Sequence, residues 1–151
     1  MKPLNPEQLY SYGLALLTRR ERSEQSLLQK LTERGEPESA RLVLDRLVQE
    51  GWASDRRFVE SYTRYRIEKG FGPLHIKQYL FFEGISSEFF EKVILAMEVD
   101  WDHVMKNTLE KKFKNLGKET LTPALKGKIQ RFLVSRGFEL NRVWIGIRKL
   151  S

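Results

Sequence analysis

Lysine and arginine side chains with the spacing needed to contact phosphate gather near the C-terminal end of the chain. Residues 101–151 hold 12 Lys and Arg against 4 Asp and Glu, a net charge of +8, whereas residues 1–52 and 53–100 have net charges of 0 and −1. A basic excess in one segment favours contact with nucleic acid or another polyanion, although a solvated lysine-rich surface has the same composition. The main candidates for phosphate contact are Lys111, Lys114, Lys118, Lys128 and Arg131.

Helical geometry places these candidates away from the expected core. At about 100° per residue, a helix that buries Leu109, Phe113 and Leu116 carries the first three lysines together on its opposite face. The other two candidates lie one turn apart and point away from the apolar positions Ile129 and Leu133. The sequence therefore predicts two helices that each present a basic face.

Further arginines are weaker candidates for the same contact: Arg19, Arg20, Arg22, Arg57, Arg64 and Arg136. The first three fall at a predicted helix end, where cations complement the helix dipole. In the middle of the chain, Glu60 and Glu68 stand three or four residues from arginines, so ordinary intrahelical ion pairs are expected there. Such pairs favour a structural role for these arginines over ligand binding.

Aromatic side chains could stack on nucleic-acid bases, as they do in grooves for single strands. Tyr62 and Tyr65 lie on a predicted apolar stripe, so core packing is the favoured interpretation. Phe81 and Phe82 are different, because the side chains of adjacent helical residues point about 100° apart. We therefore do not expect both rings to be buried. One of these two rings is therefore expected to serve a partner or another part of the chain.

No constellation of residues predicts catalysis. His75 and His103 are isolated, and the chain has no cysteine, so neither a metal site nor thiol chemistry is expected. The glycines around Phe71 lack the lysine of a phosphate-binding loop and predict a turn between helices. We therefore expect a protein that is not an enzyme, without catalytic residues, cofactor or metal.

The helices that must position the basic residues are predicted from a repeated sequence pattern. Two aliphatic residues and a glycine recur at positions i, i+4 and i+8, with the glycines 49 and then 53 residues apart. The three copies are Leu27, Leu31, Gly35; Ile76, Leu80, Gly84; and Ile129, Leu133, Gly137. Each glycine is expected to end a helix in the left-handed conformation, followed in the last two copies by an apolar residue that packs back on the helix. In the first copy Glu36 breaks this pattern and Pro37 redirects the chain.

Apolar stripes before and after each triplet predict three helices per copy. Helix starts agree with this: Asn5 and Gln8 form a capping box, and Pro73 and Pro123 stand at first helical positions. Further candidate caps are Ser23, Ser54 or Asp55, and Ser86. We expect an all-α chain of three tandem three-helix repeats, 1–52, 53–100 and 101–151, that forms an elongated, curved helical solenoid.

The compartment and the oligomeric state are expected from composition. The chain lacks cysteine, a secretory segment and an apolar run near the roughly 20 residues that a membrane span needs. A reducing, cytoplasmic location without a membrane partner is therefore expected. A solenoid with polar ends needs no partner to fold, so a monomer is expected as well.

Three stretches together carry a resemblance that spans residues 14–150. The first is Arg19-Arg20-Glu21-Arg22-Ser23, continuing to Leu27, Lys30, Leu31, Arg34 and Gly35. The second is Gly51, Asp55, Arg57, Phe58, Gly70, Gly72, Pro73, Ile76, Leu80, Gly84 and Ile85. The third is Lys112-Phe113, Lys128-Ile129-Gln130-Arg131-Phe132-Leu133 and Arg136-Gly137-Phe138. These residues resemble the RecX family, bacterial regulators of the RecA recombinase.

The resemblance implies a non-enzymatic helical-repeat protein that binds the RecA filament on DNA, lies along its groove, and inhibits or remodels it. It implies contact with single- and double-stranded DNA without sequence specificity. The family commonly has arginine where this chain has His75, and often a charged helix end in place of Phe81 and Phe82. Two alternatives remain open: a general DNA-binding helical protein, and a helical scaffold that binds another protein.

Overall fold

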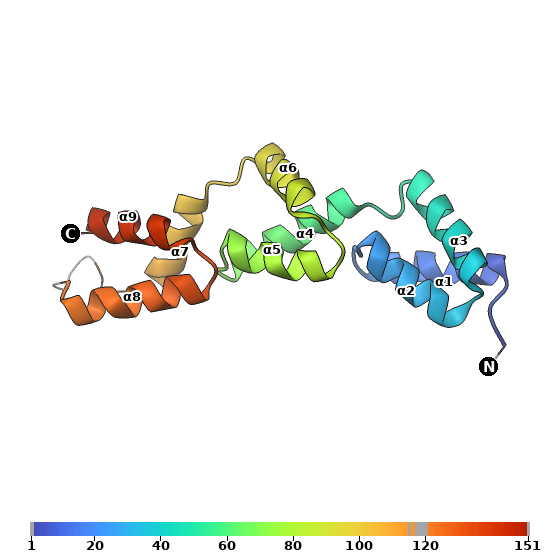
Figure 1. Ribbon diagram of the computed structural model, residues 1–151, viewed down its shortest axis with the longest axis horizontal. Coiled ribbons are helices and arrows are strands. Elements are labelled where there is room, and N and C mark those ends of the chain that lie inside the picture. Colours follow the sequence, from blue (N-terminus) through green and yellow to red (C-terminus); the bar gives the residue numbers. More distant parts are fainter. Residues whose placement is uncertain (1, 115, 117–120, 151) are drawn as a thin grey trace. The chain divides into compact units, whose positions relative to one another are not determined.

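The computed structural model describes residues 2–114, 116 and 121–150. Over these residues the chain is all-α, with nine helices and no strand beyond an isolated bridge between Leu4 and Gly35 (Figure 1). The helices are α1 (Pro6–Arg19), α2 (Glu24–Arg34), α3 (Pro37–Gln49), α4 (Asp55–Glu68), α5 (Pro73–Phe82), α6 (Ser87–Met97), α7 (Trp101–Lys112), α8 (Pro123–Ser135) and α9 (Leu140–Leu150). None of these described helices is long and apolar enough to cross a bilayer. The predicted all-α class is confirmed, whereas the elongated, curved solenoid stays a prediction.

The chain divides into two compact units. The first consists of Met1–Ser61 with Leu80–Val93, and the second consists of Tyr62–Tyr79 with Ile94–Ser151. Helices α4, α5 and α6 each contribute residues to both units. The division into repeats at 52 and 100 stays a prediction, and each unit is described by itself below.

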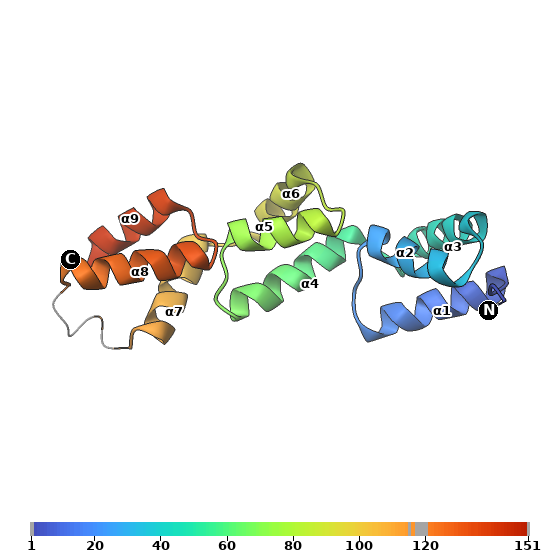
Figure 2. The ribbon, with the colours of Figure 1, turned by 60° about the horizontal axis from the view of Figure 1, so that its bottom comes forward.

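In the first unit, α1, α2 and α3 enclose one apolar core (Figure 2). Leu9, Leu27, Leu31 and Leu47 are fully buried at its centre. Gly13 lets α1 approach closely, because a Cβ atom there would lie 2.8 Å from Leu47 Cδ1. The aliphatic residues of the first predicted triplet thus form the contact surface of α2.

In the second unit, α7, α8 and α9 pack on one another around a second core. Ile129 and Leu133 of α8 are buried there, together with Phe138 and with Val143 and Ile147 of α9. Two other apolar residues of α9, Leu140 and Trp144, are 46% and 41% exposed. The third triplet nevertheless supplies the core-facing side of α8, which leaves the opposite side of that helix to solvent.

The glycine endings are confirmed in the second and third copies. Gly84 and Gly137 have φ angles of 86° and 94°, in the left-handed region. Ile85 N donates to Leu80 O at 2.9 Å and Phe138 N to Leu133 O at 3.2 Å, the 6→1 bond of a Schellman ending. Gly35 is different: its φ of −142° is extended, so a left-handed ending is wrong for the first copy. Instead, Leu4 N donates to Arg34 O as an N-terminal segment passes beside this helix end.

The predicted helix starts are also confirmed. Asn5 and Gln8 form the capping box of α1, with hydrogen bonds of 2.8 and 3.0 Å between side chains and backbone. The side chains of Ser23, Ser54 and Ser86 accept backbone hydrogen bonds at the starts of α2, α4 and α6. Because these caps satisfy donors that a helix leaves unpaired, they fix where each helix begins.

Candidate nucleic-acid interface

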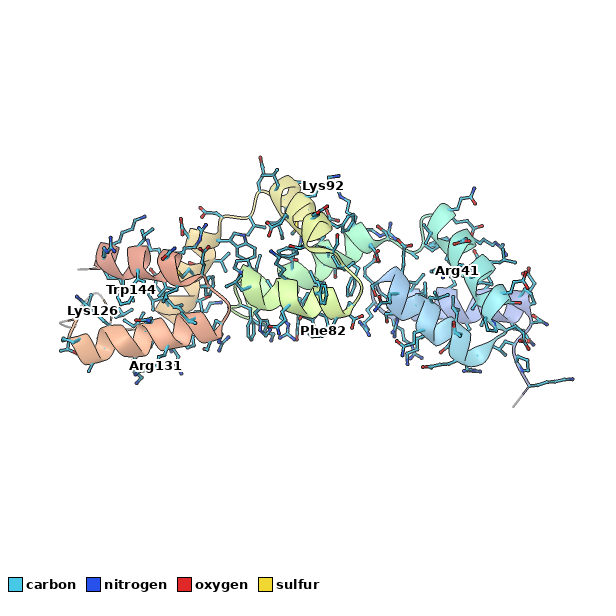
Figure 3. The ribbon with its side chains drawn as sticks, viewed as in Figure 1. Arg41, Phe82, Lys92, Lys126, Arg131 and Trp144 are labelled. Atoms are coloured by element: carbon cyan, nitrogen blue, oxygen red, sulfur yellow. The ribbon has the colours of Figure 1, made fainter. Side chains whose placement is uncertain are left out.

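Helix α8 presents the two predicted cations that the structure places together. Lys128 and Arg131 are exposed, whereas Ile129 and Leu133 are buried. Figure 3 shows Arg131 projecting from the side of α8 that faces away from α9. Within the described part of the chain neither cation forms an ion pair, so the prediction of a basic, solvent-facing side is correct for this helix.

The predicted basic face before α8 is wrong in its geometry. Helix α7 ends at Lys112, because Phe113 takes a non-helical conformation with φ −119° and ψ 76°. Lys111 is therefore exposed on the last turn of α7, whereas Lys114 lies beyond the helix in an exposed turn. Lys118 lies outside the described residues. Phe113 and Leu116 pack against the core of α7–α9 without extending the helical stripe that was predicted.

The arginines between α1 and α2 form a crowded positive group. Arg19 and Arg20 are exposed, and Arg22 is half-buried. Burial is the main cause that lowers the pKa of the Arg22 guanidinium, and the charge of Arg20 adds to it. The buried Nε of Arg22 has no hydrogen-bond partner among the described residues. These arginines remain weaker candidates for an anion contact.

The two weaker candidates on α4, Arg57 and Arg64, do not form the ion pairs that were predicted for them. Arg57 pairs with Glu21, at 3.0 Å between Nε and Oε1, and its Nη2 donates to the carbonyl oxygens of Gly51 and Trp52. The expected intrahelical pair is therefore wrong, since Glu60 pairs with Arg56 instead. Arg64 is exposed and forms no ion pair in the described part of the chain.

Arg136 lies in an aromatic setting that the sequence did not predict. Its guanidinium carbon is 4.7 Å from the ring centre of Phe71 and 5.1 Å from that of Phe132. Its Nη1 donates to the carbonyl oxygen of Lys69 at 2.9 Å. No carboxylate pairs with this arginine within the described residues. The surrounding rings and a backbone carbonyl hold it in place.

A second arginine, Arg66, continues this arrangement along α4. Its guanidinium carbon lies 5.4, 5.5 and 5.2 Å from the ring centres of Tyr62, Tyr65 and Phe71. Contacts between rings and between rings and cations therefore connect nine residues of the second unit, which we call the aromatic–cation chain. Its members are Tyr79, Tyr62, Arg66, Tyr65, Lys69, Phe71, Arg136, Phe132 and Lys112.

A close backbone contact brings the start of α5 to the end of α8 and so assembles the aromatic–cation chain. Gly72 N donates to Arg136 O at 2.7 Å, and Leu74 N donates to Gly137 O at 3.0 Å. A Cβ atom on Gly72 would lie 2.6 Å from Gly137 O, so only glycine permits this approach. The predicted turn around Phe71 therefore positions Arg136.

His75 lies close to the positive charges of this region. Its ring stacks on Phe71 at 4.2 Å. Burial is the largest cause that lowers the pKa of His75, and the charges of Arg66 and Arg136 lower it further. The lowered pKa favours the neutral form of His75, in contrast to a permanent cation such as arginine.

Sequence analysis missed Arg66, Lys69 and Lys112 as site residues, and it assigned Tyr65 to the core. Tyr65 is 52% exposed, and the buried positions of α4 are Phe58, Val59 and Thr63. One available signal was the i, i+4 spacing of Tyr62 and Arg66, which lets a cation meet a ring on one helix face. In the described part of the chain, no group of three or more acidic or histidine side chains is placed to hold a metal ion.

Comparisons with known proteins identify the fold and the family. Residues 10–47 match the family domain described as RecX, first three-helix domain, and residues 54–94 match RecX, second three-helix domain. The chain is 39% identical over 131 residues to "Regulatory protein RecX" of Haemophilus influenzae (strain PittEE), across 85% of this chain and 86% of that one. This chain belongs to the RecX family.

Other RecX proteins extend this likeness. "Regulatory protein RecX" of Xanthomonas axonopodis pv. citri is 38% identical over 132 residues, covering 87% of this chain and 80% of the relative. A crystal structure of RecX from Lactobacillus salivarius covers 96% of both chains with a TM-score of 0.79 at 21% identity. A crystal structure of regulatory protein RecX covers 95% of this chain and 71% of its own, with a TM-score of 0.74 at 23% identity. These two structures support the RecX fold.

Proposed function

We propose that this chain is a non-enzymatic regulator that binds the RecA filament on DNA. It modulates, and mostly inhibits, the ATPase, assembly and strand exchange of that filament. The observation that carries this proposal is the similarity to proteins named regulatory protein RecX across most of the chain. The exposed cations of α8, which form no ion pair with any described residue, support it, since both DNA and an acidic protein surface attract such a face.

The mechanism needs no chemistry by this protein. A regulator that binds one state of a filament better than another shifts the filament toward that state, by an amount set by the difference in affinity. Several weak contacts on separate helices add up when they engage together. The proposed contacts are Lys111, Lys114, Lys118, Lys128 and Arg131. The weaker candidates Arg19, Arg20, Arg22, Arg57, Arg64 and Arg136 are proposed as secondary contacts. DNA is bound through its phosphates without sequence specificity, and the protein acts as a monomer.

The test measures the ATPase rate of RecA on single-stranded DNA as the protein is added. The double variant Lys128→Glu/Arg131→Glu should lose most of the inhibition shown by the natural chain, because charge reversal turns attraction into repulsion. The matched control is Arg41→Glu/Lys92→Glu, which reverses two exposed cations of the first unit (labelled in Figure 3) that have no ion pair in the part of the chain that the structure describes. Circular dichroism should give equal helix content for all three proteins.

Three outcomes contradict the proposal or part of it. An ATPase rate that the natural chain leaves unchanged, with tight binding to naked DNA, would favour a general DNA-binding protein. An unchanged rate without DNA binding would favour a helical scaffold for another protein. Equal inhibition by both charge-reversed variants would be consistent with regulation of RecA but would contradict a contact through α8.

A further inference from the structure

We infer that Tyr65 and Tyr79, with Arg66 and Lys69, form a stacking site for the bases of single-stranded nucleic acid. The inference rests on the proposed function, since it assigns a site for the DNA strand that such a regulator would meet. It differs from the basic face of α8, where only phosphate contacts are proposed. All four residues lie in the second unit.

The first observation is a preformed aromatic stack between α4 and α5. The rings of Tyr62 and Tyr79 have centres 4.3 Å apart and an angle of 14° between their planes. Tyr79 is 37% exposed although Tyr62 covers one of its faces. A nucleic-acid base added to the outer side of Tyr79 would continue an existing stack. Because the tyrosine is already held in place, little side-chain freedom is lost on binding.

The second observation is a fixed cation beside these rings. Arg66 Nε donates to the hydroxyl oxygen of Tyr62 at 2.9 Å, and its guanidinium lies between the rings of Tyr62 and Tyr65. It forms no ion pair with a carboxylate among the described residues. Its positive charge is therefore held in place by rings and is not neutralised, which suits contact with a phosphate.

The third observation is an exposed lysine next to an exposed ring. Lys69 Nζ lies 5.7 Å from the ring centre of Tyr65, and both side chains are open to solvent. A base stacked on Tyr65 would bring its phosphate within reach of this lysine. Grooves for single strands combine these parts, stacking rings for bases and cations for the backbone between them.

A structural role explains the partly buried rings of the aromatic–cation chain, but it does not explain the exposed ones. Phe71 and Phe132 are partly buried and hold Arg136, so they have a structural role. Among the rings of the aromatic–cation chain, Tyr65 and Tyr79 are the most exposed, at 52% and 37%, and the buried residue at the centre of α5, Ile76, is aliphatic. The lowered pKa of His75, caused first by burial and then by Arg66 and Arg136, agrees with a positive field there.

The chemistry of this site selects single strands. A ring can stack on a base only when that base is free of its neighbour, as in single strands and not in an intact duplex. Stacking uses the face common to all bases, so the site should tolerate any sequence. Binding to a single strand should therefore depend on the bases as well as on the phosphates.

The experiment compares two strands that share phosphates and differ in bases. A fluorescein-labelled thymidine oligonucleotide and an abasic strand of equal length are titrated with the full chain, and anisotropy is followed. We expect the thymidine strand to bind at least about 10-fold more tightly, because each base that stacks on an aromatic ring adds to the affinity. Tyr65→Ala/Tyr79→Ala should lose most of that preference, while its affinity for the abasic strand stays unchanged.

The matched control is Tyr65→Phe/Tyr79→Phe, which keeps both ring faces and should keep the preference. Equal affinity of the natural chain for the two strands would overturn the inference, as would an alanine double variant with an undiminished preference. The RecA ATPase assay on the same proteins separates this result from the proposed function. Inhibition without a base preference would overturn the stacking site alone, and a base preference without inhibition would support the site and contradict regulation of RecA.

Discussion

Two tyrosine–arginine contacts, one in each unit, differ in what surrounds them. In the first unit the Arg46 guanidinium lies 3.8 Å from the ring centre of Tyr10, and in the second unit that of Arg66 lies 5.4 Å from the ring centre of Tyr62. Arg46 pairs with Glu50 at 3.4 Å and with Glu7 at 3.7 Å. The Tyr10 hydroxyl donates to the same Glu50 at 2.6 Å. In the first contact the charge of the arginine is thus compensated by carboxylates.

The second contact has no such neutralisation. Arg66 and Arg136 pair with no carboxylate in the described part of the chain and lie among aromatic rings. Ring faces attract a cation without cancelling its charge, whereas a carboxylate cancels it. The comparison teaches that the neighbours of an arginine, more than its exposure, decide whether it can take up an anion. By this criterion Arg57 and Arg46 are occupied, and Arg66 and Arg136 are available.

The largest expected effect concerns the backbone that supports the second contact. Gly137 has φ 94°, and a Cβ atom there would lie 2.5 Å from His75 N. Gly137→Ala should lower the free energy of unfolding by more than about 2 kcal/mol, because the left-handed cost of about 1–2 kcal/mol adds to this clash. Urea unfolding followed by circular dichroism measures the change.

The control for this prediction is Gly51→Ala in the first unit. Gly51 has a similar φ of 82°, but nothing lies within 4 Å of an added Cβ atom. Its substitution should cost only the left-handed term of about 1–2 kcal/mol. Equal losses for the two alanine variants would show that the contact between Gly137 and the start of α5 does not hold the second unit together.

The helix endings show how far sequence reasoning extends. The apolar contact expected in a Schellman ending made the ends at Gly84 and Gly137 predictable. At Gly70 the sequence predicted a turn but not a Schellman ending, although Phe71 N donates to Arg66 O at 3.0 Å in the same way. There an arginine stands where an aliphatic residue was expected, and a cation–ring contact of 5.2 Å replaces the apolar one. The residue that obscured this type of ending, Arg66, is also a member of the proposed stacking site.

The candidate site was less predictable than the fold. The exposed face of α8 follows from helical period alone, so Lys128 and Arg131 could be placed correctly. The aromatic–cation chain draws its members from α4, α5, α7, α8 and the turn after α4, and no local pattern connects residues so far apart. The early end of α7 was equally hidden, since Phe113 and Leu116 keep helical spacing while they pack on the core outside a helix.

A smaller effect should separate available from occupied arginines in binding to a single strand. The dependence of affinity on salt falls by about 0.7 in logarithmic slope for each lost phosphate contact on a single strand. We expect Arg66→Gln to reduce the slope by about this amount and Arg46→Gln to leave it unchanged. Anisotropy titrations of a thymidine oligonucleotide at several salt concentrations measure both. An equal reduction of the slope in both variants would contradict the distinction between an arginine that pairs with carboxylates and one that lies among aromatic rings.

The smallest effect is a pH dependence of folding stability, and the cause of the pKa shifts differs between the two regions. In the first unit the hydrogen bond to Glu50 raises the pKa of Tyr10, and the same bond lowers the pKa of Glu50. In the second unit burial, then Arg66 and Arg136, lower the pKa of His75 below its ordinary value of about 6.5. As pH falls through this value, the unfolded chain binds a proton that the folded chain does not, so folding stability decreases.

His75→Phe keeps a ring to stack on Phe71 and removes this titration. We expect the natural chain to lose stability relative to His75→Phe as pH falls below about 6.5, and the difference to level off below the folded pKa. Subtracting the two denaturation curves cancels the carboxylates, which titrate in both proteins. Arg136→Met should raise the pKa of His75 in an NMR titration without restoring it fully, because burial is the larger cause. A His75 that titrates above 6.5 in the natural chain would require a carboxylate beside it, and the second region would then resemble the first.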